Sequence, residues 1–221
     1  MILNLKPLNE FVDYHHFKMD TFQTALKLIQ AGCFMASVDL KDAYYSIPVH
    51  PEHRKYLMFK WEGQYYQFTC LPNGLSSAPR VFTKILKPVY SHLRSIGHIC
   101  MGHIDDSLLL VAYSLGSCRK NIYDTVNLFT LLGFTIHLVK SVLEPTQTIQ
   151  FLGFVIDSVA MTVKLPPSKA AKVKSACQNV SIFPVGHLYR CWFSRHYNQH
   201  QSLVVLLCFL VVVVLLLVGL S

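Results

Sequence analysis

The sequence lacks several patterns that define common classes of protein. Its seven cysteines include no C-x-x-C pair, which argues against a disulfide framework and against a zinc site. It contains no internal repeat and no glycine pattern of the Rossmann or P-loop type. No long apolar run follows a basic start at the N-terminus, so a secretory signal peptide is not expected there. The lack of a disulfide framework fits a reducing compartment best.

Acidic residues are few, and none follows Asp157. The 221 residues include 20 Lys and Arg against 12 Asp and Glu, giving a net charge of +8. This charge favours a polyanionic partner, either nucleic acid or an acidic membrane surface. A hydrophobic content of 52% excludes a largely disordered protein. Charged residues become rare after about residue 180, where we place a boundary.

The C-terminal tail is apolar. Residues 203–220 are 18 consecutive Leu, Val, Cys, Phe and Gly residues without a charge. At ~1.5 Å per residue, a hydrophobic helix of this length just spans a bilayer core. One interpretation is a tail anchor in a membrane, with the preceding chain cytosolic by the positive-inside rule. The other is an appendage without a selected role, on a protein that is otherwise cytoplasmic or nuclear.

The order of hydrophobic patterns predicts an α+β fold. Helices are expected over 19–31, 80–95 and 119–132 and from 166 onward, and strands over 34–40, 44–49, 56–60, 64–69, 96–104, 107–112, 134–139 and 149–157. The strands 56–60 and 64–69 are expected to form a hairpin around Gly63. Ser168 is expected to cap the last helix.

Three aspartates lie at the ends of expected strands. Asp39 ends one apolar run, and Asp105 and Asp106 occupy the tip of an expected hairpin. Crowded carboxylates repel each other unless a cation neutralises them. If the strands are neighbours, the three provide the all-oxygen ligands that Mg²⁺ prefers, with room for two ions roughly 3.5 to 4 Å apart. The alternative is a polar turn at 105–106 and a helix cap at Asp39.

Five segments, in their order and spacing, resemble the palm motifs of reverse transcriptases from retroviruses and retrotransposons. They are V-D-L-K-D-A-Y at 38–44, L-P-N-G-L-S-S-A-P at 71–79, I-D-D at 104–106, L-G-F at 132–134 followed by Lys140, and F-L-G-F at 151–154. The resemblance covers roughly residues 1–175. It implies a fingers-palm fold with a ferredoxin-like antiparallel palm sheet packed on helices, to which the tail adds a C-terminal hydrophobic helix.

The resemblance also implies a domain organisation. Residues 1–165 would form fingers and palm, 166–180 the start of a thumb helix, 181–202 a linker and 203–220 a transmembrane helix. On this resemblance, the fingers would be shorter than in relatives, and the thumb would stop near residue 180.

Site residues follow from the resemblance, residue by residue. The catalytic group would be Asp39, Asp105, Asp106 and Lys140, and the Leu40 carbonyl would complete the metal site formed by the three aspartates. The nucleotide-binding group would be Leu40, Lys41, Asp42, Tyr44, Asn73 and Gly74. The primer grip would be Phe151, Leu152, Gly153 and Phe154, and the residues in contact with the nucleic-acid backbone would be Lys169, Lys172 and Lys174. Other interpretations stay open: Tyr44 as a core aromatic, Lys140 as a solvated lysine, 151–154 as a core strand and the three lysines as a solvated helix face.

The implied activity is RNA-directed DNA polymerisation, in which deoxynucleoside triphosphates extend a primer on an RNA or DNA template. The implied cofactor is two Mg²⁺ ions, with Mn²⁺ as a substitute. His103 departs from the family, which usually has an aromatic residue there, and a protonated imidazole would repel Mg²⁺ at acidic pH. The alternative function is a catalytically weak or inactive nucleic-acid-binding remnant, anchored in a membrane by its tail. The oligomeric state is left open.

Overall fold

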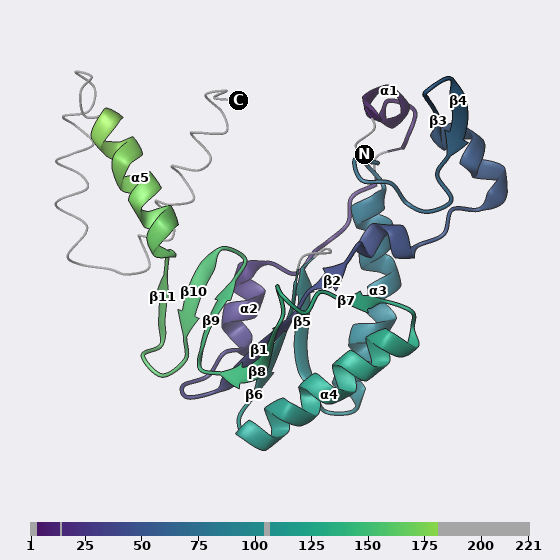
Figure 1. Cartoon of the computed structure of the whole chain (residues 1–221). Helices are drawn as coiled ribbons and strands as arrows, with labels where there is room; N and C mark the ends of the chain where they lie inside the picture. The colour runs from purple at the N-terminus through teal and green to yellow at the C-terminus, as the bar shows by residue number, and fades with distance from the viewer. Residues whose placement is uncertain (1–3, 14, 104–106, 181–221) are drawn as a thin grey trace. The chain divides into compact units, whose positions relative to one another are not determined.

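The computed structural model describes residues 4–13, 15–103 and 107–180 (Figure 1). The chain divides into two compact units, residues 1–165 and residues 166–221. The described elements of the first unit are α1 (Lys6–Asn9), α2 (Phe22–Leu28), β1 (Phe34–Val38), β2 (Leu40–Lys41), the 3₁₀ helices η1 (Ala43–Ser46) and η2 (Pro51–Leu57), β3 (Met58–Trp61), β4 (Gln64–Gln67), α3 (Ala78–Ser95), β5 (Ile99–His103), β6 (Ser107–Ala112), α4 (Leu115–Leu131), β7 (Thr135–Ile136), β8 (Val142–Thr146), β9 (Thr148–Phe151), β10 (Phe154–Asp157) and β11 (Thr162–Lys164). In the second unit, α5 spans Pro167–Val180.

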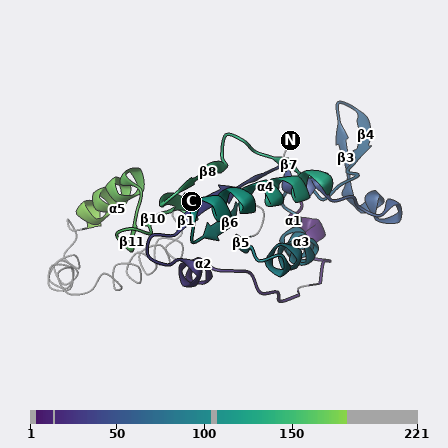
Figure 2. The same ribbon diagram turned by 90° about the horizontal axis from the view of Figure 1, so that it is seen from below.

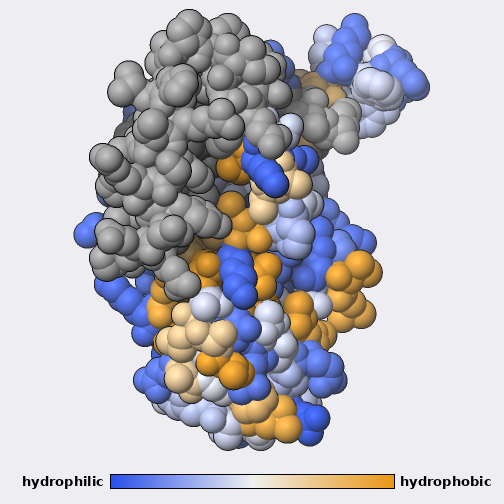
Figure 3. All heavy atoms as spheres, turned by 90° about the vertical axis from the view of Figure 1, so that its left-hand side faces the viewer, coloured by the Kyte–Doolittle hydropathy of each residue, from blue (hydrophilic) through white to orange (hydrophobic). Residues whose placement is uncertain are grey.

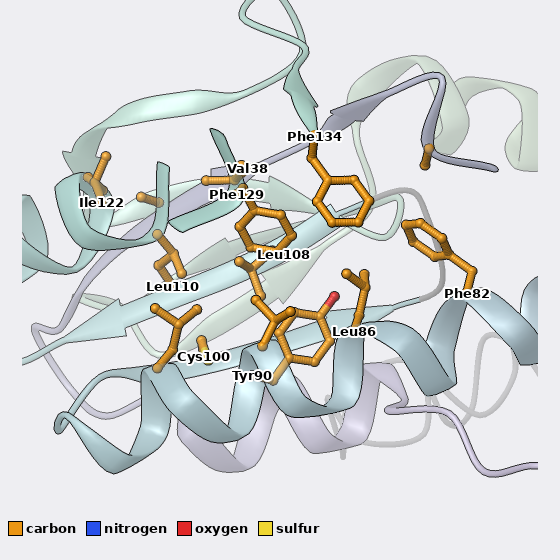
Figure 4. Packing of buried hydrophobic residues seen from close by; sticks show 14 of the residues in the cluster. Val38, Phe82, Leu86, Tyr90, Cys100, Leu108, Leu110, Ile122, Phe129 and Phe134 are labelled. Atoms are coloured by element: carbon orange, nitrogen blue, oxygen red, sulfur yellow. The ribbon is translucent and has the colours of Figure 1, made fainter. Parts of the chain in front are cut away.

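The centre of the first unit is a four-stranded antiparallel sheet in the order β5-β6-β1-β8. Strands β1 and β6 lie in the middle, and their apolar residues alternate between two faces, as the period of two in a strand requires. Val38, Leu108 and Leu110 face α3 and α4, where they pack with Phe82, Phe129 and other buried residues (Figure 4). The antiparallel α+β architecture that the sequence predicts is therefore confirmed.

The opposite face of this sheet has its own core. Met35, Met101 and Leu109 pack there against Ala25 of α2 and against Phe151 of the smaller β11-β10-β9 sheet. The sheet is thus covered on both faces, which explains why β1 and β6 read as nearly continuous apolar runs in the sequence.

A separate β3–β4 hairpin extends away from the four-stranded sheet (Figure 2). Its turn places Glu62 at φ 48° and Gly63 at φ 82°. Two successive residues with positive φ form the hairpin turn whose twist matches that of the flanking strands. The predicted hairpin around Gly63 is confirmed.

Several local predictions are wrong. The expected strand 134–139 is reduced to β7, and the expected strand 149–157 is divided into β9 and β10 by a turn at Leu152 and Gly153. Residues 44–46 of the expected strand 44–49 belong instead to the 3₁₀ helix η1, because Asp42 adopts a left-handed conformation (φ 52°, ψ 39°) that ends β2. The Ile47 N–H then donates to the Tyr44 carbonyl (3.0 Å), closing a turn that a strand cannot contain. Ser168 does not cap α5, since the helix already begins at Pro167.

No described helix is both long and apolar enough to cross a membrane. The expected transmembrane helix at 203–220 lies outside the described residues and stays a prediction. On the face drawn in Figure 3, hydrophobic residues reach the surface among hydrophilic ones, as they do on most folded proteins.

An ion cluster joins α4 to the start of β5. The Asp124 carboxylate accepts hydrogen bonds from Lys120 Nζ (2.5 Å) and His98 Nε2 (2.7 Å). The hydrogen bond from Lys120, and then that from His98, holds the pKa of Asp124 below its ordinary value. A carboxyl whose folded-state pKa is depressed stabilises the fold above the unfolded-state pKa, and this contribution is lost as pH falls through the folded-state value.

Replacement of Asp124 by asparagine should therefore destabilise the protein in a pH-dependent way. At neutral pH the free energy of unfolding should fall by a few tenths to about 1 kcal/mol, as is typical of partly exposed ion pairs. The deficit should shrink as the wild-type carboxyl becomes protonated in acid. Urea unfolding of both proteins across this pH range measures the effect, and a deficit independent of pH would contradict it.

Candidate active site

The end of β1 carries the first carboxylate of the predicted site. Val38 pairs with Leu108, and His103 pairs with Ser107, so β1 ends where β5 ends and β6 begins. Asp39 directly follows β1 and is half-buried. The three strands lie side by side in Figure 1. The metal site was predicted on the condition that the strand before Asp39 and the hairpin that carries Asp105 and Asp106 are neighbours. Since β1 pairs with β6, this condition is met.

Asp105 and Asp106 lie outside the described residues, in the connection 104–106 between β5 and β6. The described part of the chain contains no cluster of three or more His, Cys, Asp or Glu residues that could hold a metal. Because two of the three predicted carboxylates are outside it, this result does not bear on the predicted set.

The backbone of Asp39 is held by a segment about 100 residues away in the sequence. Its N–H donates to Ser141 Oγ (2.9 Å), and its carbonyl accepts from the His137 N–H (2.8 Å). Lys140 is the residue before Ser141, is exposed, and donates its N–H to the His137 carbonyl (3.1 Å). The turn 137–141 therefore brings the backbone of Lys140 close to that of Asp39. Sequence reasoning missed Ser141 because no local pattern indicates so distant a contact.

The expected nucleotide-binding residues after Asp39 follow on β2 and η1. Leu40 and Lys41 pair with β7, leaving Leu40 half-buried and Lys41 exposed. Asp42 is exposed at the left-handed turn. Tyr44 lies edge-on to Phe82, with ring centroids 5.5 Å apart. This contact places Tyr44 at the margin of the core, where it is partly buried.

Tyr45 takes a different direction from Tyr44. Successive residues of a 3₁₀ helix project about 120° apart, and Tyr45 stacks on Phe68 with ring centroids 6.3 Å apart. Tyr44 and Tyr45 therefore project in different directions, and each has its own aromatic partner.

Hydrogen bonds with Tyr45 and with Asn9 hold the turn at Asn73 and Gly74. Asn73 Nδ2 donates to the Tyr45 hydroxyl (3.2 Å). Asn9 Nδ2 donates to the Gly74 carbonyl (2.9 Å), and the Ser76 N–H donates to Asn9 Oδ1 (2.9 Å). Gly74 has φ +92°, a conformation that side chains other than hydrogen rarely tolerate. Sequence reasoning missed Asn9, which lies 65 residues from Gly74 and in no motif that was used.

Residues 151–154 form the tip of the β9–β10 hairpin. Phe151 pairs with Phe154, and Leu152 (φ 46°) and Gly153 (φ 79°) make the turn. Phe151 is buried, while Phe154 stacks on Phe22 of α2 with ring centroids 4.5 Å apart. Leu152 and Gly153 thus lie in a turn and not in a strand. The role of residues 151–154 as a primer grip stays a prediction.

The imidazole of His103 is oriented by a hydrogen bond to the backbone of the segment before α2. Its Nδ1 lies 2.6 Å from the Asp20 carbonyl, and because a carbonyl only accepts, Nδ1 carries the proton. Asp20 in turn lies 3.7 Å from Arg94, which also donates to the Cys100 carbonyl (3.0 Å). This set of contacts connects the segment before α2 to the end of β5.

In the second unit, the predicted backbone-contacting lysines lie on α5. Lys169, Lys172 and Lys174 are all exposed. Their role stays a prediction.

The central antiparallel sheet, backed by α3 and α4 and carrying a carboxylate where two neighbouring strands meet, defines a polymerase-type palm. Residues 1–156 match the family model described as reverse transcriptase (RNA-dependent DNA polymerase). The chain belongs to this family.

Curated relatives are polyproteins of plant viruses and transposons. The chain is 23% identical over 175 residues to the enzymatic polyprotein of Cestrum yellow leaf curling virus, and 24% identical over 162 residues to the Transposon Tf2-3 polyprotein of Schizosaccharomyces pombe. These alignments cover 79% and 73% of this chain, but only 26% and 12% of the respective polyproteins. The chain thus corresponds to a small part of each relative.

Solved structures with the same fold include the foamy viral protease-reverse transcriptase in two kinds of complex. With double-stranded DNA, the TM-score is 0.69 at 19% identity, over 79% of this chain and 29% of that one. With an RNA/DNA hybrid, the TM-score is 0.65 at 20% identity, over 78% and 22% of the two chains. At this level of identity, the similarity establishes the fold.

Proposed function

We propose that this chain is the RNA-directed DNA polymerase portion of a retroelement, adding deoxynucleotides to a primer by two-metal-ion nucleotidyl transfer. The observation that carries the proposal is the position of Asp39 at the end of β1, beside the paired ends of β5 and β6. The connection between those two strands contains the remaining two aspartates in sequence. Family membership supports the reaction class.

The donor set suits magnesium. Asp39, Asp105 and Asp106, with the Leu40 carbonyl, offer only oxygen atoms, and Mg²⁺ prefers carboxylates together with the phosphate oxygens of its substrate. Bound divalent ions would supply the positive charge that activates the primer hydroxyl and neutralises the triphosphate. The protein's own part is to hold the Asp39 backbone rigidly through Ser141 and His137. The exposed ammonium of Lys140 would deliver a proton to the leaving pyrophosphate.

The nucleotide would lie between the turn at Asn73 and the segment 40–44. Lys41 would face the triphosphate, and the ring of Tyr44 would exclude a 2′-hydroxyl. The Gly74 backbone would approach the nucleotide closely, because no Cβ intervenes. The hydrogen bond that Asn9 donates to the Gly74 carbonyl and the one that it accepts from the Ser76 N–H would keep this turn in place before the substrate arrives.

Replacement of Asn9 by alanine tests this positioning role. The two lost hydrogen bonds are worth about 0.5 to 1.5 kcal/mol each, so the KM for deoxynucleotides should rise roughly 5-fold to 150-fold. Hydrogen exchange at the Ser76 amide should accelerate, which a loss of chemistry alone would not produce. The matched control is Asn4→Ala, which replaces another exposed asparagine near the N-terminus. An unchanged Ser76 exchange rate would show that Asn9 does not hold the turn.

The proposed partners are an RNA or DNA template and its primer. The net charge of +8 favours such a polyanion. Known structures of the same fold hold double-stranded DNA and an RNA/DNA hybrid. The proposed primer grip 151–154 and the exposed lysines of α5 would contact the primer and the phosphate backbone.

Primer extension and primer–template binding, measured together, test the proposal. The full chain should extend a primer on an RNA template, and Asp105→Asn should abolish extension while leaving binding equal or slightly tighter, since a negative charge is removed. Binding without extension by the wild-type chain, with either Mg²⁺ or Mn²⁺, would instead support the nucleic-acid-binding remnant.

A further inference from the structure

Three aromatic side chains of the β3–β4 hairpin are exposed to solvent. Trp61, Tyr65 and Tyr66 are 56%, 70% and 46% exposed. Single exposed apolar residues are ordinary, but several on one small element indicate a binding surface. None of them belongs to the motifs that define the catalytic site.

The strand register sorts these rings onto two faces. Phe59 pairs with Tyr66, and Trp61 pairs with Gln64, so the side chains of these four residues share one face. Tyr65 lies on the opposite face beside Lys60, whose Nζ is 5.4 Å from the centroid of the Tyr65 ring. The hairpin therefore has one face with a cation over its ring and a second face with two exposed rings.

The second face continues toward the nucleotide turn. Tyr66 stacks on Phe59 (centroids 5.6 Å apart, 19° between ring planes), and Phe59 contacts Phe68 at 5.5 Å. Phe68 stacks on Tyr45, whose hydroxyl accepts a hydrogen bond from Asn73. We call Trp61, Tyr66, Phe59, Phe68 and Tyr45 the aromatic row. It leads from the exposed hairpin to the turn where the incoming nucleotide is proposed to bind.

We propose that the exposed end of the aromatic row, Trp61 and Tyr66, stacks on unpaired bases of a single-stranded template before they reach the nucleotide site. Every base has a π-face, so stacking on aromatic side chains binds single strands without regard to sequence. Lys55, exposed on η2 just before the hairpin, provides positive charge for the backbone phosphates. The assignment of the strand as template rests on the proposed polymerase function. The affinity for single strands does not.

Trp61 itself reports on stacking. The chain has two tryptophans, so Trp192→Phe leaves Trp61 as the only indole fluorophore. Oligothymidylate of about 12 nucleotides, a length within the site sizes of single-strand-binding folds, should quench this fluorescence. A blunt duplex of the same length should quench it much less.

Variants on the two faces of the hairpin provide a matched comparison. Trp61→Leu with Tyr66→Leu keeps apolar bulk but removes the rings, and should weaken oligothymidylate binding about 5-fold to 100-fold, since one stacked base is worth about 1 to 3 kcal/mol. Tyr65→Leu, on the opposite face, should change binding less than 2-fold. Primer extension should show the same contrast on a template with a long single-stranded overhang, and no contrast on one with a single unpaired base.

The outcomes separate this inference from the proposed function. If the oligonucleotide quenches the fluorescence and only the Trp61 and Tyr66 variant loses binding, but no primer is extended, the proposed stacking surface is supported and the proposed polymerase function is contradicted. Normal extension with no quenching, or with equal effects of the two sets of variants, would overturn the stacking surface alone. Self-association lost in the Trp61 and Tyr66 variant, without oligonucleotide binding, would also overturn it by making this face a contact between copies of the chain.

Discussion

Replacing Asp39 with asparagine is expected to reduce primer extension by at least about 10²-fold to 10³-fold, the loss typical when one group that stabilises transition-state charge is removed. The amide is close in size to the carboxylate, and the backbone bonds of Asp39 to Ser141 and His137 do not involve the side chain. These backbone bonds should therefore persist while the negative charge that would hold the proposed metal is lost. Single-turnover extension on a primed RNA template measures the effect.

Two further variants sharpen this result. Glu144→Gln, at an exposed carboxylate on β8, makes the same chemical change away from the site and should leave extension unchanged. Asp39→Asn combined with Asp105→Asn should be no worse than the more severe of the two single variants, because groups that act as one unit are strongly non-additive. Multiplicative losses would indicate that the two aspartates act separately and would contradict a shared metal site.

Replacing Gly102 with alanine is expected to destabilise the fold by about 1 to 3 kcal/mol, the usual cost of overpacking. A Cβ at this position would overlap the hydroxyl and ring carbons of Tyr90. Tyr90 is 9% exposed on α3, and burial raises the pKa of its phenol far above the ordinary value. The hydroxyl thus remains protonated at neutral pH, and the ring lies against Gly102 of β5. Because Gly102 precedes His103 at the end of β5, the strand that leads to the aspartates must shift.

Thermal unfolding measures this cost, which should lower the Tm by roughly 2 to 12 °C. Gly116→Ala is the control, because its added Cβ meets nothing within 4 Å on α4, and alanine in a helix is about 0.5 to 1 kcal/mol more favourable than glycine. In a Tyr90→Leu background, Gly102→Ala should cost less than in the wild type. An equal cost in both backgrounds would show that Tyr90 is not the obstacle.

Much of the palm could be predicted from the sequence because its elements have strong local signals. The β1 and β6 runs are apolar on both faces, and the position of Asp39 at the end of one run follows from the order of residues alone. The turn at Glu62 and Gly63 is likewise a local property of a short hairpin. These features depend on neighbours in the sequence, and the structure agrees with them.

Features that depend on distant segments could not be read from the sequence. The strand expected at 44–49 fails because Asp42 turns the chain, although Tyr44 and Tyr45 have high strand propensity. The hydrogen bonds from Asn9 to Gly74 and from Asp39 to Ser141 span 65 and 102 residues. Tertiary contacts of this kind have no periodic signature, so they emerge only once the sheet is assembled.

The most direct test of the account is incorporation of a single deoxynucleotide by the full chain into a labelled primer annealed to RNA, with Mg²⁺ or with a chelator. The account predicts a primer one nucleotide longer only in the presence of Mg²⁺, and only with the nucleotide complementary to the template base. Absence of this product, in a preparation whose near-ultraviolet circular dichroism shows fixed aromatic packing and which binds the primed template, would contradict the assignment of Asp39, Asp105 and Asp106 as a working polymerase site.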